Sequence, residues 1–329
     1  MTSRTGKLTT LSRAVDRFVT DGCSIVTGTY MEQKIPFAAA HEIIRQGKRD
    51  LTLIGPISDI LFDQMIGAGS VRRVEAAWVG NVMMGSAYNF RRAVEEQLPG
   101  PLEVIDYTNF TLALGLHAAA LGVPFLPTFA TLGTTLGKEN PKFVPFEDPT
   151  EPAGRTLVAV KAIHPDVAIV HACKADPNGN GMVWGNLGVT ADAVAAAESV
   201  IVMAEQIVEP GELQTDPNRN LIHGFQVDAV CHVPFGCHPS PVQGYYDRDN
   251  DWFADYHRAS KSAAEFHAWL RQWVLDLPDW QAYLERVGKA RLEGLVPREG
   301  LRAKPILTGH LSGRSPRSAG SGDHGANTP

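Results

Sequence analysis

The chain has 329 residues, of which 44% are hydrophobic and 20% are charged, and its net charge at pH 7 is -6. This is the composition of a globular protein that can bury a large core. The acidic balance, without a block of lysines and arginines in the part expected to fold, argues against a nucleic-acid-binding surface. The sequence contains no apolar run of 18 residues, so no membrane-spanning helix is predicted.

Charged residues also interrupt the N-terminal region where a signal peptide would need an apolar segment, at Asp16, Arg17 and Asp21. The four cysteines lack C-x-x-C spacing, and most lie in apolar, strand-like surroundings. We therefore predict buried free thiols and a cytoplasmic location. The cysteines are Cys23, Cys173, Cys231 and Cys237.

The first 120 residues alternate between apolar strand-like runs and helix-like runs. The expected helices span residues 8–18, 36–46, 58–66, 88–97 and 108–121, and the expected strands span residues 24–26, 51–54, 71–79 and 102–107. Such alternation with short connections is typical of an α/β fold, a largely parallel sheet with helices on both faces. Because ligands of such sheets bind beyond the carboxyl ends of the strands, the turns that follow these strands are the candidate sites.

The alternation stops at residues 124–148, which we predict to be a long loop that is functional or packs on a partner. Strands resume at residues 167–172, 199–204 and 227–233. The aromatic-rich residues 252–287 are expected to form helices that cap the sheet or face another subunit. The sequence thus predicts one domain over residues 1–311, with a helical part at about 252–290, and a disordered tail over residues 312–329.

The first candidate site is the turn between the expected strand at residues 24–26 and the helix that starts near Pro36. Its sequence is Val26-Thr27-Gly28-Thr29-Tyr30. A strand, a small-residue turn and a helix start can bring backbone amides close to an anion or a reacting carbonyl. The sequence has neither the G-x-G-x-x-G spacing of dinucleotide-binding proteins nor that of a phosphate-binding Walker loop.

The remaining chemistry-bearing residues show no recognisable catalytic spacing. His171 and His232 lie in buried-strand patterns and are interpreted as core histidines, and no pair of histidines has metal-ligand spacing, so no metal site is predicted. Four glutamates are candidate carboxylate nucleophiles, but the pattern gives none of them a partner. Each is therefore interpreted as a solvated or capping carboxylate: Glu32, Glu75, Glu205 and Glu209.

Residues 165–180, which read PDVAIVHACKADPNGN, resemble the alpha (A) subunit of family I coenzyme A transferases, and that of glutaconate CoA-transferase in particular. Segments at residues 51–55, 67–71, 122–127, 235–240 and 244–247 support the resemblance, which covers about residues 7 to 295. It implies the fold shared by the NagB, RpiA and CoA-transferase proteins, an α/β sheet with helices on both faces.

The resemblance also implies a reaction in which CoA moves from an acyl-CoA to a free carboxylate through a glutamyl-CoA intermediate. In most of the family the nucleophilic glutamate belongs to a beta subunit, whereas the alpha subunit offers a glycine-rich loop whose amides approach the carbonyl. A beta subunit, an acyl-CoA and a carboxylic acid are thus the expected partners, in an α2β2 or larger hetero-oligomer. The CoA thioester is a substrate, and no permanently bound cofactor is expected.

The turn at residues 27–30 occupies the position of that loop, but it has one glycine between two threonines where the family commonly has two adjacent glycines. Asparagines that follow two other strands are expected to line the same edge of the sheet, and a hydroxyl-rich segment is expected to hold the acyl carboxylate or the edge of the partner. The residues expected to position the substrate are Thr27, Gly28, Thr29, Tyr30, Gly80, Asn81, Asn109, Gly133, Thr134 and Thr135.

Two alternatives remain. A branch of the same fold hydrolyses ring-containing CoA thioesters derived from steroids, with a glutamate that its own alpha subunit supplies after the strand that corresponds to residues 102–107. Here Asn109 lies nearest to that position, and an amide cannot act as the base. The second alternative is a non-catalytic subunit that binds an acyl-CoA without turning it over.

Overall fold

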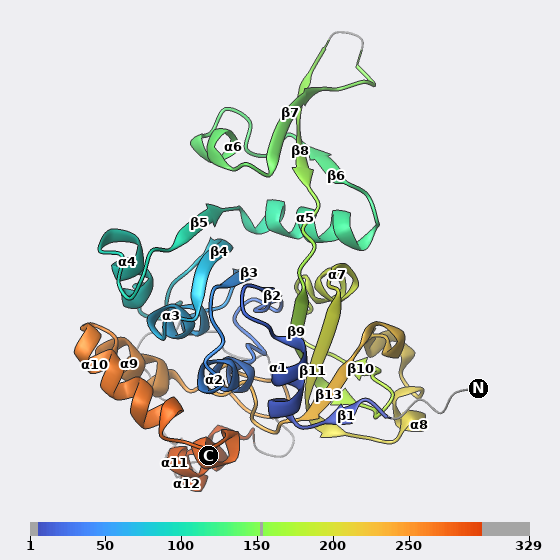
Figure 1. Cartoon of the computed structure of the whole chain (residues 1–329). Coiled ribbons are helices and arrows are strands. Elements are labelled where there is room, and N and C mark those ends of the chain that lie inside the picture. Colours follow the sequence, from blue (N-terminus) through green and yellow to red (C-terminus); the bar gives the residue numbers. More distant parts are fainter. Residues whose placement is uncertain (1–5, 152–153, 298–329) are drawn as a thin grey trace, which may run out of the picture.

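The computed structural model describes residues 6–151 and 154–297. Its main sheet follows the order β1-β13-β11-β9-β2-β3-β4-β5, in which every pair of neighbours is parallel (Figure 1). These strands are β1 (Leu8–Thr9), β2 (Ser24–Val26), β3 (Leu51–Ile57), β4 (Val71–Trp78), β5 (Glu103–Asp106), β9 (Val167–Ala175), β11 (Ser199–Ile207) and β13 (Ala229–His232). The short β10 (Gly181–Met182) pairs antiparallel with β9 and with β12 (Asn220–Ile222). The predicted parallel sheet is confirmed.

Two apolar cores lie on opposite faces of this sheet, because side chains along a strand alternate between its faces. Ile25 and Ile169 belong to one core, and Val26 and Val170 to the other. Both faces are covered, so the central strands are buried almost throughout, as is typical of parallel sheets. The first core is covered by α1 (Leu11–Phe18), α2 (Phe37–Arg45), α3 (Ile60–Gly67) and α4 (Tyr88–Glu95), and the second by α5 (Asn109–Ala120) and α7 (Thr190–Ala196).

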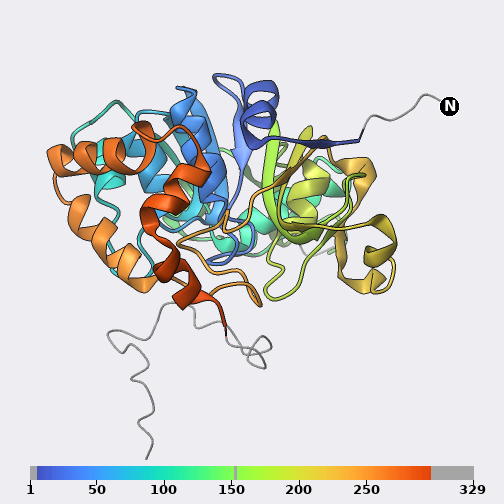
Figure 2. The same ribbon diagram turned by 90° about the horizontal axis from the view of Figure 1, so that it is seen from below.

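The aromatic-rich C-terminal part forms a further helical layer (orange to red in Figures 1 and 2). Trp269, Trp280 and Tyr283 join the core that also contains α2 and α3, so these helices pack on other helices rather than directly on the sheet. They are α9 (Asn250–Ala259), α10 (Ala263–Leu270), a π-helical turn at Arg271–Leu275, α11 (Trp280–Val287) and α12 (Lys289–Leu295). Short helices at Pro210–Leu213 (α8), Pro217–Arg219 and Gly224–Gln226 connect β11 to β13.

The prediction of a long loop at residues 124–148 is wrong. This segment contains β6 (Phe125–Thr128), α6 (Thr135–Glu139) and β7 (Phe143–Glu147), and it forms a three-stranded antiparallel sheet with β8 (Thr156–Lys161). The central strand β8 follows later in the sequence, so the pairing is not visible in the segment itself. In Figure 1 this small sheet lies beyond α5, away from β2 and β3.

Two further expectations concern the helix near the N-terminus and the C-terminal tail. The helix expected at residues 8–18 begins only at Leu11, because Leu8 and Thr9 pair with β13 and the Thr10 side chain caps the helix. The tail predicted for residues 312–329 lies outside the described residues. Within the ranges that the structure describes, no helix is both long enough and apolar enough to cross a membrane.

Candidate functional site at the carboxyl edge of the sheet

The turn after β2 packs tightly against the turn after β3, at the edge where the parallel strands end. Gly28 adopts a positive φ of 65°. A Cβ atom at this position would lie 2.0 Å from Ser58 Oγ and 2.6 Å from the carbonyl oxygen of Ile57. Both the backbone conformation and the close approach therefore require glycine.

The backbone carbonyls of this turn all accept hydrogen bonds within the chain, whereas most of its amides donate none to the described residues. The Thr27 amide donates to Ile54 O at 3.0 Å, and the Met31 amide donates to Gly28 O at 3.2 Å. Within the described part of the chain, the amides of Gly28, Thr29 and Tyr30 donate no hydrogen bond. All three residues are buried, and buried backbone donors are nearly always paired. The turn therefore has three amide donors that no group of the described chain uses.

The side chains of the turn point into the protein. The Thr29 hydroxyl lies 2.7 Å from that of Thr190. Thr27 lines a small internal cavity between α2, α3 and the sheet. The ring of Tyr30 is buried beneath the Lys34 ammonium group, which lies 4.5 Å from the ring centroid. The hydroxyls of Thr27 and Tyr30 have no hydrogen-bond partner among the described residues, but both are enclosed by the protein.

Residues 184–190, which connect β10 to α7, hold the turn from one side. The Lys34 ammonium group donates to Trp184 O at 3.2 Å and to Asn186 O at 3.1 Å. The Asn186 amide group donates to Tyr30 O at 3.1 Å, and Val189 N donates to Thr29 O at 2.8 Å. Burial lowers the pKa of Lys34 below its usual value. The turn is therefore held in place by residues 184–190, which lie far from it in the sequence.

Gly80 and Asn81 follow β4 on the same edge. Asn81 Oδ1 accepts from the amides of Met83 and Met84, and its Nδ2 donates to Phe253 O at 3.1 Å. Its side chain thus stabilises the turn after β4. Val82 N donates to Asp59 Oδ1 at 3.2 Å, which joins this turn to the one after β3. These residues share the edge with Gly28.

Asn109 does not join this group. It is exposed, begins α5 and follows β5, which is three strands from β2 in the sheet order. At the usual strand spacing this separation is about 14 Å. Asn109 thus follows a strand at the carboxyl edge, as expected, but it lies apart from Gly28 within this chain, and its role in binding substrate stays a prediction.

Gly133, Thr134 and Thr135 lie on the small antiparallel sheet rather than beside the turn (Figure 1). All three are exposed. The Thr134 hydroxyl caps α6 by accepting from Gly137 N at 3.0 Å, and it donates to Thr131 O at 2.7 Å. Because α5 and β6 intervene, the segment lies apart from β2 within this chain. Its expected contact with the acyl carboxylate or with the edge of the partner stays a prediction.

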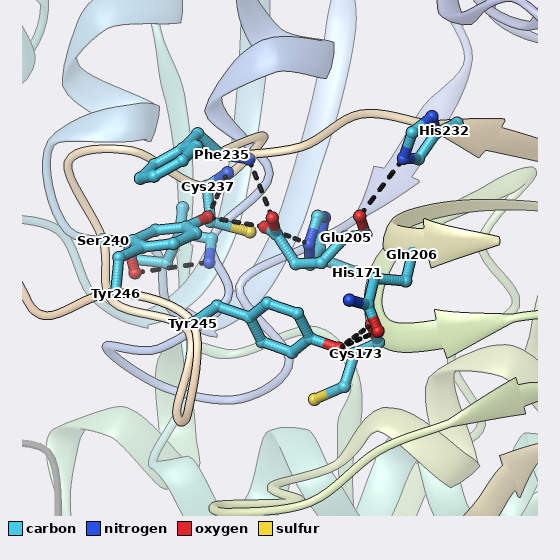
Figure 3. A network of polar contacts seen from close by, with 11 residues as sticks. His171, Cys173, Glu205, Gln206, His232, Phe235, Cys237, Ser240, Tyr245 and Tyr246 are labelled. Atoms are coloured by element: carbon cyan, nitrogen blue, oxygen red, sulfur yellow. Dashed lines mark hydrogen bonds and ion pairs between the residues drawn. The ribbon is translucent and has the colours of Figure 1, made fainter. Parts of the chain in front are cut away.

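Sequence reasoning missed a buried network around Glu205 at the carboxyl end of β11 (Figure 3). Glu205 Oε1 lies 2.8 Å from His171 Nε2 and accepts from the Tyr246 hydroxyl at 2.8 Å. Its Oε2 accepts from Phe235 N at 2.8 Å. The Glu205 side chain is only 3% exposed. The interpretation of Glu205 as a solvated or capping carboxylate is therefore wrong. His171 is confirmed as a buried histidine of the core, although its Nδ1 has no hydrogen-bond partner among the described residues, and the same interpretation of His232 is wrong because that residue is exposed.

Glu75 also differs from the expectation, since it is buried and accepts from the Tyr107 hydroxyl at 3.2 Å, whereas Glu209 is exposed as predicted. A sequence signal did exist for Glu205, because it directly follows the apolar run of a predicted central strand. The four cysteines are buried and unpaired. In the described ranges, no group of three or more His, Cys, Asp or Glu side chains is placed to hold a metal ion.

A parallel sheet with unpaired amides in a turn at its carboxyl edge is typical of α/β proteins that bind ligands beyond the ends of their strands. Residues 8–232 match the family described as Coenzyme A transferase, and the chain belongs to this family. It is 38% identical to the alpha (A) subunit of 3-oxoadipate CoA-transferase of Pseudomonas knackmussii, over 87% of this chain and 99% of the relative. It is 35% identical to the alpha (A) subunit of glutaconate CoA-transferase of Acidaminococcus fermentans, over 90% of this chain and 96% of the relative.

The solved structures agree with this assignment. The crystal structure of glutaconate coenzyme A-transferase from Acidaminococcus fermentans matches with a TM-score of 0.85 and 35% sequence identity, over 89% of this chain and 96% of that chain. The resemblance inferred from the sequence is thus confirmed at the level of family and fold. Both relatives identified by sequence are the alpha (A) subunits of CoA-transferases.

Proposed function

We propose that this chain is the alpha subunit of a heteromeric CoA-transferase that moves CoA between an acyl-CoA and a small dicarboxylic acid. The observation that carries the proposal is the set of unpaired amides at Gly28, Thr29 and Tyr30, in a chain that belongs to the CoA-transferase family. The acid class follows from the relatives named above, since 3-oxoadipate and glutaconate are both dicarboxylic acids.

In this proposal the turn binds the thioester carbonyl and stabilises the negative charge that develops on its oxygen. A carboxylate of the partner attacks the carbonyl carbon, expels the CoA thiolate and forms an acyl-glutamyl anhydride. The thiolate then attacks the glutamyl carbonyl, which releases the first acid and leaves a glutamyl-CoA thioester. The second acid reverses these steps and leaves as its CoA ester. Each oxyanion donor of this kind contributes about 10²–10³ in rate.

The attacking glutamate is assigned to the beta subunit. Glu75 and Glu205 of this chain are buried, and hydrogen bonds from neighbouring side chains occupy their carboxylates. A thioester cannot reach either carboxylate without disrupting the core. In this proposal, another subunit brings the attacking carboxylate to the carboxyl edge.

The test is to purify the chain with and without a co-encoded beta subunit, and then to measure CoA exchange. Succinyl-, acetyl- and glutaryl-CoA serve as donors, and mono- and dicarboxylic acids serve as acceptors. We expect exchange only in the complex, and fastest with dicarboxylic acids. Full activity of the isolated chain contradicts the assignment of the glutamate. CoA release without an acceptor acid indicates a hydrolase instead, and acyl-CoA binding without exchange by the complex indicates a non-catalytic subunit.

A further inference from the structure

The carboxylate of Glu205 has a fixed set of donors. Tyr246 accepts a hydrogen bond from Cys237 N at 3.1 Å, so its own proton is directed to Glu205. Burial first, and then the negative charge of Glu205, raise the pKa of Tyr246 well above its usual value, and the hydroxyl stays protonated. With Phe235 N on the other oxygen, Glu205 anchors both ends of residues 235–246 to the end of β11.

Residues 235–246 in turn hold the segment that follows the site turn. The Ser240 hydroxyl donates to Glu32 O at 2.7 Å, and Lys34 N donates to Pro241 O at 3.0 Å. At the start of α2, Ala38 N donates to Gly236 O at 3.0 Å. The backbone on the C-terminal side of Gly28 is therefore fixed by a segment that Glu205 itself fixes.

The two segments that hold the turn are also joined to each other. The Trp184 indole nitrogen donates to Gln243 O at 2.9 Å, and its ring stacks on Tyr245 with centroids 6.0 Å apart. Residues 184–190 and residues 235–246 thus form one continuous support around residues 28–34. Glu205 attaches this support to the sheet, together with the Tyr245 hydroxyl, which lies 2.9 Å from Cys173 O and 3.1 Å from Gln206 Oε1 (Figure 3).

We propose that Glu205 is a positioning residue for CoA transfer, which acts by holding the amides of Gly28, Thr29 and Tyr30 through residues 235–246. It does not touch the reacting atoms, because its carboxylate is enclosed by the chain and its oxygens are already bonded. This inference rests on the proposed function of the turn as the site that binds the thioester carbonyl. The inference assigns a role to Glu205, whose carboxylate takes no part in the proposed steps of CoA transfer.

The test compares Glu205→Gln with Tyr246→Phe in the purified complex, and exposed Glu209→Gln provides the matched control. A carboxamide has one acceptor oxygen, so in Glu205→Gln one of the donors faces an NH2 group. We expect kcat to fall by about 10- to 100-fold, as for a small displacement of a positioning group. The KM values should change little. Tyr246→Phe should show a smaller fall in kcat, and Glu209→Gln none.

Hydrogen exchange of the amides in residues 26–34 provides a second readout that does not depend on catalysis. We expect faster exchange of this segment in Glu205→Gln and Tyr246→Phe, with unchanged exchange in β3 and β4. If the wild-type complex transfers no CoA, the proposed function fails while this readout still tests the positioning role. Wild-type kcat together with wild-type exchange at residues 26–34 in both variants overturns the inference. Uniformly faster exchange overturns it as well, because it indicates a general loss of stability.

Discussion

At the scale of single residues, the site depends on Gly28. Its replacement by alanine has two distinct effects, backbone strain and a steric clash. A left-handed backbone conformation costs a side-chain-bearing residue about 1–2 kcal/mol wherever it occurs. At Gly28 the added methyl group would also meet Ser58 Oγ and Ile57 O, and Ile57 O belongs to the backbone. The turn must then move, whereas at Gly47, with a φ of 67°, nothing lies within 4 Å of the added atom.

We therefore predict that Gly28→Ala lowers kcat for CoA exchange by at least about 10-fold, because the displaced amides no longer face the carbonyl oxygen. Gly47→Ala serves as the control, since it introduces the same backbone strain without the contact. Steady-state kinetics and urea unfolding of both variants separate the two effects. Equal kcat values for the two variants would mean that the position of the turn does not matter for transfer.

At the scale of elements, the sequence predicts those strands, helices and turns whose pattern lies within a single segment. The apolar run at residues 199–204 and the glycine-containing turn after Val26 are visible without any knowledge of neighbours. The small sheet is not, because β6 and β7 are separated by β8, which lies later in the chain. The bond between His171 and Glu205 depends on β9 and β11 being adjacent and in register, with Met203 opposite His171. The hydrophobic periodicity of a segment reveals neither the order of strands in a sheet nor their register.

The packing of α10 and α11 on α2 predicts a dependence of stability on pH. His41 of α2 is buried against Trp280 and Tyr283, with ring centroids 5.4 Å and 5.3 Å away, and its Nε2 lies 3.0 Å from Gln64 Oε1. Burial, and then the charge of Arg45, lower the pKa of His41 from 6.5 to about 3. Below pH 6.5 the unfolded chain therefore binds a proton that the folded chain excludes.

The free energy of unfolding should thus be fully retained above pH 6.5 and should fall as the pH decreases toward 3. The contribution of His41 is about 1.4 kcal/mol per pH unit, or about 2 kcal/mol between about pH 7.5 and about pH 5. Urea unfolding at both pH values measures it. The His41→Gln variant should lose correspondingly less stability over this interval, and an identical loss in the variant would show that another group is responsible.

At the scale of the whole molecule, the predicted site residues separate into those that the fold gathers and those that it does not. The turns after β2, β3 and β4 form one continuous stretch of the carboxyl edge, linked through Ser58 and Asp59. Asn109 and Thr134 lie elsewhere, on exposed surface. The described chain thus places unpaired amides at this edge and buries the carboxylates of Glu75 and Glu205, which agrees with the proposal that a second subunit completes the site.

Covalent trapping tests this division between subunits. When the complex is incubated with an acyl-CoA and no acceptor acid, the glutamyl-CoA thioester should accumulate. Borohydride reduces a thioester to an alcohol, so mass spectrometry should find one glutamate of the beta subunit converted to the alcohol. The peptides of this chain that contain Glu32, Glu75 and Glu205 should stay unmodified, because Glu75 and Glu205 are buried and the attacking group is assigned to the partner. The complex treated with borohydride before acyl-CoA is the control, and a modified glutamate in this chain would place the nucleophile here instead.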